Sequence, residues 1–212
     1  MGKDIIDRFL TAANHLKRNN VGIGLLLFLN IYLSINAYMV DWDRLTVLPW
    51  YLLPVSPICT LFVPLLIVWL FIYKVKQKVH PVFTAFMFTA LVLYGMMAFI
   101  YYPLVLAVDG FSIWVILVLL FVLGWSLQAF VIASELRELH HIAYLVIAGY
   151  FFLKAYTDTF LNTFEDIDYW SKGVVGYLPV FTTSFLLLLG IALWAAWRIG
   201  ENNGKDTNAS NN

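Results

Sequence analysis

The chain has 212 residues, of which 62% are hydrophobic and 12% are charged. A soluble domain carries about 25% charged residues, so the composition excludes an ordinary soluble protein and indicates an integral membrane protein. Thirteen Lys and Arg residues balance thirteen Asp and Glu residues, which gives no reason to expect a nucleic-acid partner, and a single cysteine excludes an internal disulfide.

The first 18 residues have the pattern of a short amphipathic helix. Ile5, Phe9, Ala13 and Leu16 recur at helical spacing, and polar side chains occupy the opposite side. A helix of this kind lies in the membrane interface with its apolar face toward the acyl chains. We therefore expect residues 1–18 to lie on the cytoplasmic leaflet.

Six apolar segments follow, and each is long enough to cross about 30 Å of hydrocarbon as a helix. They are roughly residues 21–40, 57–73, 80–104, 111–134, 141–161 and 176–197. Lys and Arg are concentrated on the side of this arrangement that holds the N-terminus, which is the cytoplasmic side by the positive-inside rule. The sequence therefore predicts an all-α protein of the plasma membrane. Residues 19–200 form an integral membrane six-helix bundle, and both termini are cytoplasmic.

Aromatic residues mark one predicted membrane face, and a polar tail follows the last predicted span. Tyr101, Tyr102 and Trp114 fall near the predicted outer face, where amphipathic rings are favoured. Residues 201–212 are almost entirely polar or small and have little apolar surface to bury. We therefore expect this tail to be disordered.

Polar side chains interrupt the predicted spans at a few positions. Asn30 and Asn36 lie in the first span, and Gln128 lies near the middle of the fourth. A polar group at this depth needs a partner, because hydrocarbon offers none. We expect Gln128 to meet a partner on a neighbouring helix and Asn30 to form an interhelical hydrogen bond rather than a binding site. All three amides remain candidates for a polar site.

The fifth span carries a lysine and an aspartate four residues apart, Lys154 and Asp158. Residues at this spacing share a helix face, and helical side chains lean toward the N-terminus, so Asp158 leans back toward Lys154. Tyr94 of the third span is a further candidate for the same polar network. Two interpretations stay open: a neutralised pair that fixes the helix to its neighbours, or a proton or ion relay or polar ligand pocket.

Three histidines, His80, His140 and His141, invite a metal or haem interpretation. They fall at the cytoplasmic ends of predicted helices, whereas a zinc site needs three or four convergent ligands. A haem held by two histidines usually needs them on facing helices within the bundle. The sequence therefore predicts lipid contacts but no metal or cofactor. It also contains no HExxH, CxxC, P-loop or G-x-S-x-G motif that would support an enzyme.

Short segments in the region of residues 25–185 occur in a distinctive order. They are FLNIYLSINAY, PVSPICTLF, LYGMMAF, LQAFVI and FFLKAYTDTF, followed by GYLP. Together they resemble the YpjA-type family of small prokaryotic membrane proteins of unknown function. In this resemblance Asp158 matches a family position, whereas Lys154 and Ala155 replace an Asn and an Asp. Family members tend to be encoded near quinol–cytochrome c reductase components, so the resemblance implies a respiratory accessory role.

The sequence supports three hypotheses about function. The first is a non-catalytic accessory or assembly subunit of a larger membrane complex, with lipids and other membrane-protein subunits as its partners. The second is a small transporter or channel that uses Lys154 and Asp158. The third is a haem-binding redox protein that uses His80 with His140 or His141.

Overall fold

A computed structural model describes residues 8, 11–12, 15, 18–40, 65–68, 79–160 and 177–210. This part of the chain is mostly helical and contains no strand. Its helices are α2 (Asn20–Val40), α5 (Pro81–Asp109), α6 (Ile113–Ser126), α7 (Gln128–Ala133), α8 (His141–Phe160) and α10 (Leu178–Ser210).

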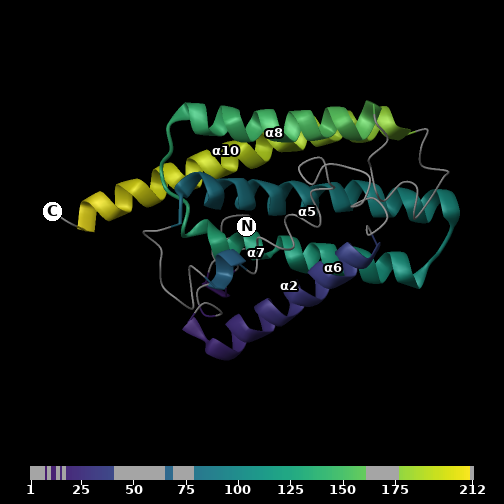
Figure 1. Ribbon diagram of the computed structural model, residues 1–212, viewed down its shortest axis with the longest axis horizontal. Helices are drawn as coiled ribbons and strands as arrows, with labels where there is room; N and C mark the ends of the chain where they lie inside the picture. Colours follow the sequence, from purple (N-terminus) through teal and green to yellow (C-terminus); the bar gives the residue numbers. More distant parts are fainter. Residues whose placement is uncertain are drawn as a thin grey trace.

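The central helix of the bundle is α5. It packs against α6 and α7 on one side and against α10 and α8 on the other, with α2 beyond α6 and α7 (Figure 1). Buried side chains extend along α5 from Thr84 near its start to Val105 near its end. A helix that is apolar on all sides forms the core of a protein, and α5 has that role here.

Local chemistry explains where α5 begins and ends. Pro81 occupies the first turn, where a missing N–H costs no helical hydrogen bond. At the other end Gly110 has φ +88°, which favours glycine, and its N–H donates to the carbonyl of Leu106 at 3.1 Å. The chain then returns after a short connection as α6, so α5 and α6 run antiparallel.

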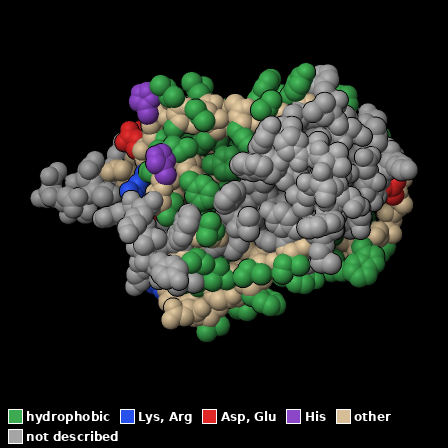
Figure 2. Space-filling view, in the orientation of Figure 1, with side chains coloured by type: hydrophobic (Ala, Val, Ile, Leu, Met, Phe, Trp, Pro, Cys, Tyr) green, Lys and Arg blue, Asp and Glu red, His purple; other side chains and the backbone are tan. Residues whose placement is uncertain are grey.

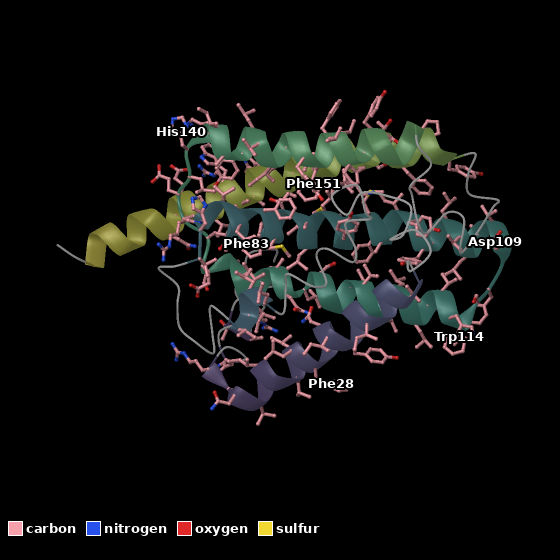
Figure 3. The ribbon with its side chains drawn as sticks, viewed as in Figure 1. Phe28, Phe83, Asp109, Trp114, His140 and Phe151 are labelled. Carbon is pink, nitrogen blue, oxygen red and sulfur yellow. The ribbon has the colours of Figure 1, made fainter. Side chains whose placement is uncertain are left out.

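Aromatic side chains fill the space between α5, α8 and α10. Phe151 of α8 is fully buried (Figure 3) and stacks on Phe86 of α5, with ring centroids 5.2 Å apart. Phe185 of α10 also lies against the Phe151 ring, with centroids 6.5 Å apart. Such pairs contribute about 0.5–1.5 kcal/mol beyond the area that they bury. These rings join the three helices into one core.

The lengths and compositions of the helices are those of a membrane protein. Three of the described helical stretches are long and apolar enough to cross a membrane: Pro81–Asp109, Ile113–Ala133 and Pro179–Gly204. Charged and histidine side chains gather at the end of the molecule where α8 begins, and an acidic group lies at the opposite end (Figure 2). Asp109 ends α5 there (Figure 3). Hydrophobic side chains cover the visible described surface between these ends.

The predicted spans are recovered to different extents. The segments predicted at residues 21–40, 80–104, 111–134, 141–161 and 176–197 overlap described helices, and those at 80–104, 111–134 and 176–197 overlap the three stretches that could cross a membrane. The span predicted at residues 57–73 lies outside the described residues except for 65–68, which are helical and include the buried Leu66 and Ile67. The fourth predicted span is divided at Leu127 into α6 and α7.

The structure describes parts of both segments that flank the predicted spans, residues 1–18 and 201–212. In the predicted interfacial helix, Arg8, Thr11, Ala12, His15 and Arg18 are helical and exposed, and its apolar positions lie outside the described residues. At the other end α10 continues as a helix through Ser210, where the sequence predicted a disordered tail from residue 201. The described contacts of this end with the α7–α8 connection involve Gly200, Asn203 and Gly204.

Candidate functional site

Two amide side chains meet between α2 and α7. Asn30 Nδ2 donates to Gln128 Oε1 at 2.8 Å and to the carbonyl oxygen of Leu26 at 2.6 Å. Asn30 is fully buried, and Gln128 is 2% exposed. The partner expected for Gln128 on a neighbouring helix is therefore Asn30. Interhelical hydrogen bonds of this kind contribute on average about 0.6 kcal/mol, and at most about 1.7 kcal/mol, in a membrane.

The helix that carries Asn30, α2, has a largely apolar outer surface. Phe28 is 71% exposed and points away from the bundle (Figure 3). The exposed large side chains of α2 are Val21, Leu25, Phe28, Ile31, Tyr32 and Ile35. Asn30 lies on the opposite, buried side of the helix together with Ile23. The contact to Gln128 thus gives α2 one polar attachment to the bundle.

A close approach between α5 and α6 occurs two residues before Gln128. A Cβ atom added at Gly95 of α5 would lie 2.6 Å from Ser126 Oγ and would also overlap Ser126 Cβ. Small residues let membrane helices approach closely, and that is the role of Gly95. Ser126 Oγ donates to the carbonyl of Val122 at 2.8 Å, a bond that bends helices. The helix is interrupted directly afterwards at the single residue Leu127, which keeps helical φ and ψ, and Gln128 begins the short helix α7.

Lys154 lies inside the bundle. Its side chain is 4% exposed, and it follows Ile147 and Phe151 along the buried stripe of α8. A charged residue at membrane depth costs about 2.5–3.5 kcal/mol on insertion scales, and it normally faces the protein interior. Tyr94 is partly buried on α5, which packs against α8. The backbone of Asp158 belongs to α8.

Two predicted site residues have side chains outside the described part of the structure. They are Asp158 on α8 and Asn36 on α2. The predicted pairing of Lys154 with Asp158 therefore stays a prediction. What the structure adds is the direction of α8, because the stripe that contains Lys154 faces the bundle and not the lipid.

Two of the three candidate histidines cap helices. Nδ1 of His80 accepts the backbone N–H of Val82 at 3.3 Å, and Nδ1 of His140 accepts that of Ile142 at 3.4 Å. The ring of His141 lies 6.0 Å from that of His140. Within the described residues, no three His, Cys, Asp or Glu side chains form a group that could hold a metal ion. Sequence reasoning missed the capping role, although the His-Pro pair at the start of α5 is a signal for it.

Three of the polar features above hold helices together or cap them. The amide pair joins α2 to α7, the two imidazoles begin α5 and α8, and the small residues at Gly95 and Ser126 bring α5 onto α6. None of these contacts combines a nucleophile with a base.

The chain matches no family model, and no curated protein or solved structure matches it. The resemblance to the YpjA-type family therefore stays a prediction.

Proposed function

We propose that the chain is a plasma-membrane protein of six spans, with both termini in the cytoplasm. In this proposal it acts as a non-catalytic accessory or assembly subunit of a larger membrane complex. The observation that carries the proposal is that the two buried amides bond to each other. Polar residues at membrane depth are costly and usually mark a functional site. Here Asn30 and Gln128 bond to each other across two helices.

The outward surface supports the same proposal. Large apolar side chains are exposed on four of the helices that surround α5, for example Phe28 of α2, Trp114 of α6, Phe152 of α8 and Trp194 of α10. Such surfaces contact lipid and the helices of partner subunits equally well. If the buried polar groups hold the helices together, the protein acts by binding partner subunits. The resemblance described above makes an electron-transport complex the first partner to test.

Deletion of the gene is expected to lower the assembled amount of one membrane complex. Blue native gels and quantitative proteomics of isolated membranes measure the change, and the wild-type chain supplied from a plasmid should restore the complex. A Gly95→Leu chain, whose helices cannot pack, is the matched control and should not restore it. If every membrane complex assembles to its normal level without the protein, the accessory role is wrong.

A transporter or channel is the second candidate, and the buried position of Lys154 on α8 favours it. In this case Lys154→Met and Asp158→Asn should each abolish flux of the transported ion in reconstituted liposomes while the protein remains folded. The control is Asp109→Asn, which changes an exposed carboxylate at the end of α5. Wild-type liposomes without flux, or variants with normal flux, would exclude this activity.

A further inference from the structure

The last helix is longer than the hydrocarbon of a membrane is thick. α10 has 33 residues, which at 1.5 Å per residue is about 50 Å, whereas the hydrocarbon is about 30 Å thick. The end of α10 passes the connection between α7 and α8 (Figure 1). That connection carries Glu135, Arg137, Glu138 and His140.

One side chain of α10 binds the end of α7. Asn203 Nδ2 donates to the carbonyl of Ala133, the last residue of α7, at 3.0 Å and to that of Leu136 at 2.9 Å. The final carbonyls of a helix have no partner within the helix, so Asn203 caps α7 from another helix. Leu136 is 2% exposed and fixes the same connection in the core.

Glycines on α10 allow this approach. A Cβ atom at Gly200 would lie 2.6 Å from the carbonyl oxygen of Arg137, which is a backbone atom and cannot swing away. One turn further along, the Cβ position of Gly204 lies 3.5 Å from Glu138 Oε2. The connection therefore rests directly on the backbone of α10.

The short helix α7 is consequently held at both ends. It has six residues and is about 9 Å long. Gln128 at its start bonds to Asn30 of α2, and Ala133 at its end accepts from Asn203 of α10. Leu127 separates it from α6 by one residue, and the N–H of Leu127 still donates to the carbonyl of Leu123 of α6 at 2.9 Å.

We propose that the C-terminal end of α10 is a latch that holds α7 in the position where Gln128 meets Asn30. Release of the latch at Asn203 loosens the attachment of α2, and loss of the α2 contact loosens the latch. Coupling between two contacts on one element is reciprocal by thermodynamic necessity. The device is independent of whether the protein is an accessory subunit or a transporter.

Hydrogen exchange of the full chain in lipid nanodiscs tests the latch, read out by mass spectrometry on peptides that cover residues 128–140. Asn203→Ala removes two hydrogen bonds, and Asn30→Leu removes the contact at the other end. Each variant is expected to speed exchange across all of residues 128–136 by about tenfold. Trypsin should also cleave faster after the exposed Arg137 in both variants.

Two matched controls accompany these variants. Asn202→Ala changes the exposed neighbour of Asn203, and Phe28→Leu changes an exposed side chain of α2, so both should exchange like the wild type. If Asn203→Ala does not accumulate, Gly200→Ala disturbs the same contact through the backbone of Arg137. Faster exchange confined to residues 134–140 in the α10 variants, or no change in them, would overturn the latch.

Discussion

Gly95→Leu is expected to prevent α5 and α6 from packing and to abolish the accumulation of folded protein. Even Gly95→Ala places a Cβ atom 2.6 Å from Ser126 Oγ and in overlap with Ser126 Cβ, so one of the two backbones must shift. Overpacking of this kind costs about 1–3 kcal/mol for small additions, and leucine exceeds that range. The helix affected is the central one, which also packs against α7, α8 and α10. Unfolding in mixed micelles with increasing dodecyl sulfate measures the loss.

Gly124 supplies the control, because nothing lies within 4 Å of a Cβ atom built there. Gly124→Ala should unfold within about 1 kcal/mol of the wild type, since alanine favours a helix over glycine by roughly that amount. A second test restores space on the partner side. Ser126→Gly should recover part of the stability lost in Gly95→Ala, and equal stabilities of Gly95→Ala and Gly124→Ala would contradict the close approach.

Asn30→Leu is expected to destabilise the protein more than Gln128→Leu does. The first change leaves the buried amide of Gln128 without its hydrogen bond. A buried polar group without a partner costs about 1–3 kcal/mol. The second change leaves Asn30 bonded to the carbonyl of Leu26. It also removes Gln128 Nε2, a buried donor that has no acceptor in the described structure.

A double-mutant cycle separates these effects. The double variant with leucine at both positions should lose less unfolding free energy than the two single variants lose together. The difference should be about 0.6–1.7 kcal/mol. Phe28→Leu on the exposed side of α2 should change the unfolding free energy little. Strict additivity of the two single changes would show that the amides do not act as a pair.

Hydropathy and the cost of buried polar groups predicted a large part of this structure. The all-helical class follows from the backbone, whose polar groups must be satisfied internally in lipid. The same argument predicted a partner for Gln128 on a neighbouring helix, and the contact with Asn30 supplies it. The position of Lys154 on the inner stripe of α8 agrees with the rule that intramembrane charges face the protein.

Other features depend on contacts between residues far apart in the chain. The close approach of Gly95 to Ser126, just before the interruption at Leu127, is not revealed by any local pattern. Tyr101 and Tyr102 are buried at 3% and 5% exposure, whereas the sequence indicated only that they fall near the predicted outer face. Tyr101 packs instead on Phe181 of α10, with ring centroids 5.5 Å apart.

The polar end of α10 shows the same limit of sequence reasoning. Its composition predicted disorder, because it has little apolar surface to bury. The helix is held instead by two side-chain hydrogen bonds of Asn203 and by the backbone contact at Gly200. Specific polar contacts to a distant segment therefore hold the start of this polar end, where little apolar surface is available.

The mass of the particle extracted from the native membrane tests the central claim most directly. Native mass spectrometry of lipid particles cut out by a styrene–maleic acid polymer keeps the protein with its neighbours and avoids detergent. An accessory subunit is expected in a particle that contains its own 24.3 kDa chain together with other polypeptides in fixed ratio. A mass equal to one chain, or to a whole multiple of it, with no other polypeptide present, would contradict the account.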